Sequence, residues 1–99
     1  MKTLLRLILF LATLSANNIY ASKDLKFLIQ QDCGSCHGLQ LKGGLGPALS
    51  KELMKTKTDQ FLFLTIKEGR AGTAMPPWKS LLSDEEINKI VQYLKEGLQ

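Results

Sequence analysis

The only two cysteines of the chain and its only histidine fall within five consecutive residues, Cys33-Gly34-Ser35-Cys36-His37. Two thiols three positions apart, followed at once by an imidazole, form the pattern at which a c-type haem is attached. The thiols of Cys33 and Cys36 add to the two porphyrin vinyl groups as thioethers, and His37 reaches the iron from one face. The sequence therefore predicts one covalent haem c with His37 as an iron ligand.

Three other uses of the thiol pair fit the sequence less well. A thioredoxin-like redox centre has the same cysteine spacing but requires a βαβ context, and no alternating strand pattern occurs here. A structural zinc site normally takes four nitrogen or sulfur ligands, one more than this motif offers. A disulfide between Cys33 and Cys36 is compatible with an oxidising compartment but leaves the neighbouring His37 to chance.

The ligand on the other face of the iron is expected to be Met75. It lies in Thr73-Ala74-Met75-Pro76-Pro77-Trp78, where two prolines stiffen the backbone that carries a weak thioether ligand. Met54 is the competing thioether, in a short helical stretch near the attachment motif. Filling a gap in the core is the alternative for Met75, since that is the commoner fate of methionine. A second histidine ligand within the chain is excluded, because none exists.

The segments that must position these residues are predicted to be helical, which makes the fold class all-α. Leu25, Leu28 and Ile29 share one helical face and indicate a helix over 22–32 that runs into the motif. A short helix is expected over 51–54, with Ser50 as its cap. A second is expected from about Asp59 to Gly69, with apolar residues nearly all round. The last helix begins after the capping box Ser83-Asp84-Glu85-Glu86, and its apolar stripe consists of Ile87, Ile90, Val91, Leu94 and Leu98.

Two loops interrupt these helices, over 42–47 and 70–79. The first contains Gly43, Gly44 and Gly46. A phosphate cradle is not expected there, because no strand precedes the glycines and no suitably placed Lys-Ser/Thr follows. Close approach of the backbone to the porphyrin is the better interpretation.

The amino terminus has the order of a secretory signal. Lys2 and Arg6 precede an uncharged apolar run over 7–14, and small and polar residues lead to Ala21. The run is shorter than the about 20 residues of a membrane-spanning helix, which is the alternative. We therefore expect a cleaved signal peptide at 1–21, a single domain at 22–99, and a periplasmic protein.

The charge of the exported chain gives little sign of a polyanionic partner. Without Lys2 and Arg6, 11 basic and 9 acidic residues remain, with no block of like charges. We therefore expect neither nucleic-acid binding nor, after cleavage of the signal, membrane association. Lys42, Lys51 and Lys79 are candidates for a basic rim that steers an acidic partner, or are ordinary solvated charges.

On these motifs the chain resembles the class I cytochromes c over essentially its whole exported length. The shared features are the Cys-x-x-Cys-His motif after a first helix, Gly46-Pro47-Ala48-Leu49, Met75-Pro76 in a late loop, and Tyr93-Leu94 in the last helix. More narrowly, three segments are similar to the cytochrome c-55X family: Asp32–Gly38, Gly43–Leu49 and Met75–Trp78.

The resemblance implies a small single-domain fold around one haem, in a monomer. Cys33 and Cys36 would hold the thioethers, and His37 and Met75 would be the axial ligands. The Pro47 carbonyl would accept the ring N–H of His37, and Leu49 would line the haem pocket.

The resemblance also implies a function without catalysis. The protein would carry single electrons in the periplasm, with cytochrome cd1 nitrite reductase as the acceptor in denitrification. An accessory role in maturation of the d1 haem of that reductase is one alternative. A general carrier to another terminal reductase or oxidase is the other.

Overall fold

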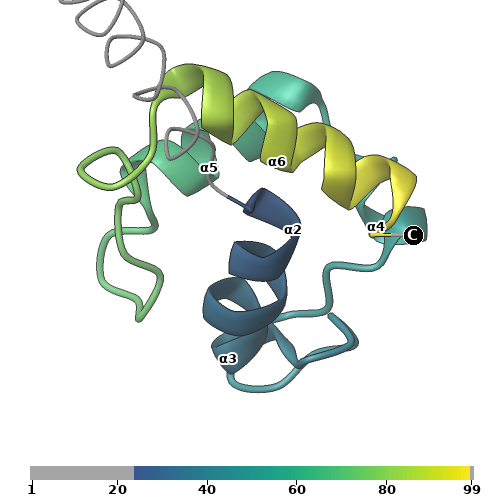
Figure 1. Cartoon of the computed structure of the whole chain (residues 1–99). Helices are drawn as coiled ribbons and strands as arrows, with labels where there is room; N and C mark the ends of the chain where they lie inside the picture. The colour runs from purple at the N-terminus through teal and green to yellow at the C-terminus, as the bar shows by residue number, and fades with distance from the viewer. Residues whose placement is uncertain (1–23, 99) are drawn as a thin grey trace, which may run out of the picture.

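The computed structural model describes residues 24–98, and all regular secondary structure in that range is helical (Figure 1). In chain order the elements are α2 (Leu25–Leu28), η2 (Ile29–Cys33), α3 (Gly34–His37), α4 (Lys51–Met54), α5 (Asp59–Glu68) and α6 (Asp84–Glu96). The predicted all-α class is confirmed. The predicted signal peptide at 1–21 lies outside the described residues. Within 24–98, no helix has the length and apolar character to cross a membrane.

The first helical segment runs without a break from Leu25 to His37 and contains a π-helical turn. Asp24 caps its start by accepting a hydrogen bond from the Phe27 amide (3.0 Å). Within η2, the Gly34 amide donates to the Ile29 carbonyl, five residues back. A regular α-helix was expected here, and its start at Ser22 lies outside the described residues. Wider π turns are rare and are found at functional sites, and this one joins the buried face of α2 to the cysteine motif.

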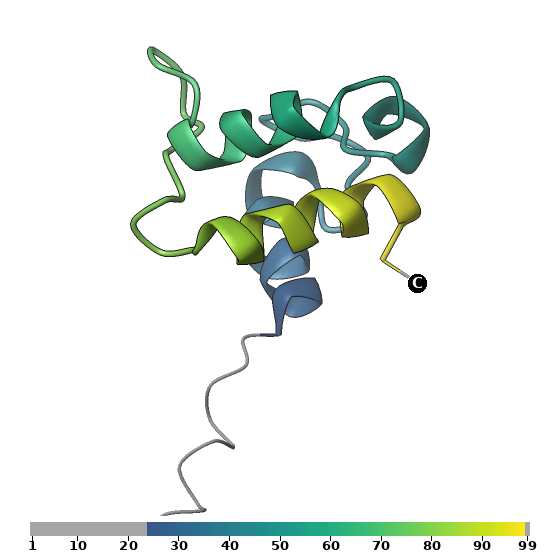
Figure 2. The same ribbon diagram turned by 90° about the horizontal axis from the view of Figure 1, so that it is seen from above.

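Helix α6 is the common packing partner of three other helices. The predicted capping box at its start is confirmed: the Ser83 hydroxyl accepts from the Glu86 amide (3.1 Å), and the Glu86 carboxylate accepts from the Ser83 amide (2.9 Å). The helix packs against α2, α4 and α5. Figure 1 shows α6 crossing the start of the α2–α3 segment, and Figure 2 shows α5 and α6 running alongside each other. Helices α2, α4 and α5 are thus positioned relative to α6.

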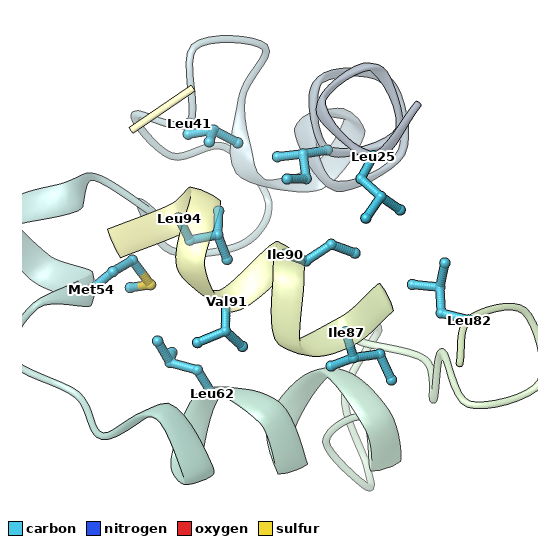
Figure 3. Close-up of a cluster of buried hydrophobic side chains, with 10 residues drawn as sticks. Leu25, Leu41, Met54, Leu62, Leu82, Ile87, Ile90, Val91 and Leu94 are labelled. Carbon is cyan, nitrogen blue, oxygen red and sulfur yellow. The ribbon is translucent and has the colours of Figure 1, made fainter. Parts of the chain in front are cut away.

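The core gathers around the apolar stripe of α6 (Figure 3). Removing each such side chain from water is worth about 1.5–3 kcal/mol, which is large beside the marginal stability of a small domain. The buried residues are Leu25, Ile29, Leu41, Met54, Leu62, Leu82, Ile87, Ile90, Val91 and Leu94.

Helix α5 buries less of its surface than its sequence suggests. Thr58 caps its start, and Gly69 ends it as expected. Only Leu62 is buried, whereas Phe61 and Leu64 are 50% and 46% exposed. Apolar residues nearly all round α5 predict burial on more than one side, and this prediction is wrong for Phe61 and Leu64, whereas Phe63 and Ile66 are partly buried against the core. Its principal partner is α6, and one neighbouring helix covers one stripe.

Candidate functional site

The imidazole of His37 is held by a carbonyl group ten residues later in the chain. Its Nδ1 lies 2.7 Å from the carbonyl oxygen of Pro47, the contact implied by the resemblance. When Nδ1 carries the proton and donates to this oxygen, Nε2 retains the lone pair that a metal needs. The bond also fixes the ring orientation and raises the basicity of Nε2. His37 is therefore prepared to bind iron through Nε2.

Glycines bring the loop after His37 into close contact with the motif. A Cβ atom at Gly46 would lie 2.8 Å from both Cε1 and Nδ1 of the His37 ring, and one at Gly44 would lie 2.8 Å from the Cys36 carbonyl oxygen. Backbone bonds run from the Gly46 amide to the Cys36 carbonyl and from the Gly43 amide to the His37 carbonyl, each 2.8 Å. These contacts give the glycines a role that the sequence analysis missed, since it assigned them to the porphyrin.

Leu41 anchors the middle of the same loop. Its backbone has a φ of +57°, which is uncommon for a residue other than glycine, and its side chain is buried in the core. The Leu41 amide donates to the Gly38 carbonyl (2.8 Å), and the Leu41 carbonyl accepts from the Leu49 amide (2.9 Å). Leu49 is half-buried against the core. The backbone strain at Leu41 is offset by burial of its side chain.

Cys33 and Cys36 are both free thiols and both half-buried. Burial, followed by the nearby charge of Asp32, raises the pKa of the Cys33 thiol to about 11. A thiolate is therefore disfavoured at this position, whereas a thioether carries no charge and does not suffer the same penalty. In residues 24–98, no three His, Cys, Asp or Glu side chains are grouped as they would be around a metal ion. This donor set suits a covalently attached porphyrin.

The two candidate thioether ligands occupy different environments. Met54 is only 5% exposed and belongs to the core between α4 and α6 (Figure 3). Met75 is half-buried on the loop between α5 and α6. The Met75 carbonyl accepts from the Arg70 amide (3.1 Å), and its amide donates to the Thr73 hydroxyl (3.2 Å). Core packing accounts for Met54 and leaves Met75 as the better candidate.

The three lysines considered as a docking rim are not equivalent. Lys79 lies 2.8 Å from the Glu68 carboxylate, so its charge is locally compensated. Lys42 and Lys51 are exposed and lie elsewhere, on the loop after His37 and at the start of α4. The described geometry therefore weakens the expectation that Lys79 attracts an acidic partner.

The proteins that this chain resembles are c-type cytochromes, in agreement with a haem-binding site at the Cys33–His37 motif. Residues 21–94 match the family model described as cytochrome C oxidase, cbb3-type, subunit III, a c-type cytochrome domain. Cytochrome c55X of Stutzerimonas stutzeri is 51% identical over 73 residues, which cover 74% of this chain and 65% of the relative. Cytochrome c55X of Pseudomonas aeruginosa is 51% identical over 75% of this chain and 62% of the relative. The match thus spans less than two thirds of either relative.

A third relative and two solved structures complete the comparison. Cytochrome c55X of Paracoccus denitrificans is 41% identical over 72% of this chain and 69% of its own length. The c-type cytochrome NirC superposes with a TM-score of 0.71 at 51% identity, covering 74% of this chain and 86% of NirC. The dihydro-heme d1 dehydrogenase NirN, in complex with DHE, superposes with a TM-score of 0.65 at 31% identity, over 71% of this chain and 15% of NirN. This chain therefore belongs to the class I c-type cytochromes, within the cytochrome c55X family, whose members carry covalently bound haem c.

Proposed function

We propose that this chain is a periplasmic carrier of single electrons whose iron lies between His37 and Met75. The observation that carries the proposal is the Nδ1 contact of His37 with the Pro47 carbonyl (2.7 Å), which leaves Nε2 as the metal-binding atom. Both the backbone amide and the backbone carbonyl of Met75 are hydrogen-bonded within its loop. With a protein ligand on each face, no coordination position stays open for a substrate. Such a site favours outer-sphere electron transfer.

Each proposed site residue has one task. Cys33 and Cys36 form the thioethers, His37 is the proximal ligand, and Leu49 lines the pocket. When bound, the haem supplies reversible one-electron chemistry between ferrous and ferric iron. A thioether from Met75 in apolar surroundings favours the ferrous state more than a second imidazole does, so it raises the reduction potential. The signal peptide at 1–21 delivers the domain at 22–99 to the periplasm.

The proposed electron acceptor is cytochrome cd1 nitrite reductase, in nitrite respiration. Support comes from the 51% identity to cytochrome c55X and to NirC. The test is stopped-flow mixing of the reduced, haem-loaded protein with the purified reductase. We expect the reductase to oxidise the protein much faster than oxygen-free buffer does. No acceleration by the reductase would contradict this partner and favour a general carrier serving another terminal reductase or oxidase.

A second candidate function is a role in maturation of the d1 haem of that reductase. The observation in its favour is the similarity to a part of NirN, a dihydro-heme d1 dehydrogenase. A dehydrogenase requires an acceptor for the electrons it removes, and a small cytochrome is a chemically suitable acceptor. Under this alternative, a strain lacking the gene produces reductase without d1 haem. Under the first proposal, that strain produces complete reductase that lacks an electron donor.

A further inference from the structure

The Met75 loop is closed at its base by two consecutive backbone hydrogen bonds. The Trp78 amide donates to the Ile66 carbonyl (3.0 Å), and the Lys79 amide donates to the Lys67 carbonyl (3.3 Å). A third bond, from the Arg70 amide to the Met75 carbonyl, crosses the loop above them. The part of the loop that leads back toward α6, at Trp78 and Lys79, therefore lies against the last turn of α5. The Met75 side chain has no polar group to direct it, so its position follows from that of its backbone.

Gly69 lies at the end of α5, where the start of the loop meets the Met75–Pro77 backbone. Its φ of +67° and ψ of −166° belong to a region open essentially to glycine alone. A Cβ atom at this position would lie 2.6 Å from the Pro76 carbonyl carbon and 2.7 Å from the Met75 carbonyl oxygen. It would also lie 2.7 Å from the Pro77 nitrogen. All three neighbours are backbone atoms, so no side chain can rotate away to make room.

The geometry points to Gly69 as a positioning residue for the iron ligand Met75. The missing side chain lets the Met75–Pro77 backbone approach α5 closely and thereby sets the position of the thioether sulfur. A methyl group at residue 69 displaces this backbone, and the two prolines transmit the displacement instead of absorbing it. The inference rests on the proposed ligation by Met75, and it assigns to Gly69 a task beyond ending a helix.

A matched control lies in the same loop. Gly72 also has a positive φ (+77°), but a Cβ atom there would meet nothing within 4 Å. Gly69→Ala and Gly72→Ala both place alanine at a positive φ, and only the first also forces a steric overlap with backbone atoms. A difference between them reports the overlap with the Met75 loop together with the strain of the Gly69 backbone, and the Met75→Ala background then shows whether the effect acts through Met75.

The experiment uses the full chain, exported and haem-loaded, with carbon monoxide as the probe of an open iron position. We expect Gly69→Ala to lose the far-red thioether-to-iron charge-transfer band and to bind carbon monoxide at least tenfold more tightly than wild type. Gly72→Ala should retain the wild-type band and carbon monoxide affinity. In a Met75→Ala background, Gly69→Ala should change the affinity less than twofold, because the ligand it positions is gone.

The possible failures are distinguishable. If Met75→Ala leaves the wild-type band in place, the ligand assignment and the proposed function are wrong. If Met75→Ala removes the band but Gly69→Ala retains it, only the positioning role is overturned. Where Gly69→Ala yields no haem-loaded protein, Gly69→Asn replaces it, because asparagine is among the residues with a Cβ atom that are found most often at positive φ. If both variants fail to load while Gly72→Ala loads normally, Gly69 serves the fold and the inference is overturned.

Discussion

The two proposed ligand sides of the iron are built differently. On the histidine side, the ligand ring itself is gripped: Pro47 accepts from Nδ1 at 2.7 Å, and the Gly46 backbone lies directly against the ring. On the methionine side, only the backbone is held, through the bonds of Arg70 and Thr73 to Met75. The histidine is a strong ligand next to the haem-attachment cysteines, and its ring is oriented directly. The methionine is a weak ligand on a distant loop, and it is oriented through its main chain. Substitutions on the histidine side should therefore prevent haem loading, whereas substitutions on the methionine side should change the ligation and the reduction potential of the iron.

The largest expected effect is that of removing the histidine. His37→Ala deletes an iron ligand and also the group on which Gly46 and Pro47 converge. We expect at least a tenfold loss of haem-loaded protein, measured as haem absorbance per mole of exported chain. Met75→Ala is the matched variant on the other side and should still accumulate with haem. Equal loading of the two variants would contradict the asymmetry.

The next effect is that of Met75→Ala on the iron itself. We expect a five-coordinate site that loses the thioether charge-transfer band, binds carbon monoxide and has a lowered reduction potential, because the ligand that favours ferrous iron is gone. Met54→Leu is the control, since Met54 belongs to the core and leucine nearly preserves its volume. If Met54→Leu removed the band and Met75→Ala did not, Met54 would be the iron ligand and Met75 would not.

A smaller effect is expected from crowding the imidazole. Gly46 does not have a positive φ, so Gly46→Ala tests the overlap with the His37 ring almost free of backbone strain. Overpacking of this kind typically costs about 1–3 kcal/mol. We expect a loss of that size in the free energy of unfolding of the haem-loaded protein, measured by urea titration, with the Met75 band retained. A neutral result would mean that the ring moves aside without cost.

The features that could be predicted from the sequence depend on residues that are close together in the chain. The capping box Ser83–Glu86 satisfies itself within one turn, and the stripe of α6 needs only helical spacing to be recognised. The cysteine motif is local in the same way. The Pro47 contact, ten residues away, was reached only through resemblance to a family.

The features that were missed depend on partners distant in the chain. The apolar pattern of the first helix ends at Ile29, and no residue type marks the π turn that follows. A glycine in a sequence shows freedom of the backbone but not which atoms approach it, so Gly69 was seen only as a helix end. For α5, counting apolar residues overestimated burial, because the number of neighbours is set by the fold. Burial of Met54 likewise emerged only from the packing of α4 on α6.

The smallest predicted effect lies away from both ligand sides, at the start of α5. Hydrogen bonds from Lys95 (2.5 Å) and Gln92 (3.0 Å), the lysine first, lower the pKa of the Asp59 carboxyl. A lowered pKa means that between the two pKa values the unfolded chain binds more protons, so stability rises with pH there. The contribution is complete above the pKa of the unfolded chain, about 3.9, and is lost as pH falls through the lower folded value.

Asp59→Asn should remove this acid-side slope from the melting temperature of the haem-loaded protein, measured from about pH 2 to 6. The group is exposed, so the change should be modest and should shrink in high salt. Glu96→Gln, an exposed acid at the end of α6, is the control and should keep the slope. Because α5 carries the Met75 loop at its other end, the Met75 band provides a second readout. A band that weakened along with the melting temperature would show that the α5–α6 contact, and not the loop alone, holds the methionine side in place.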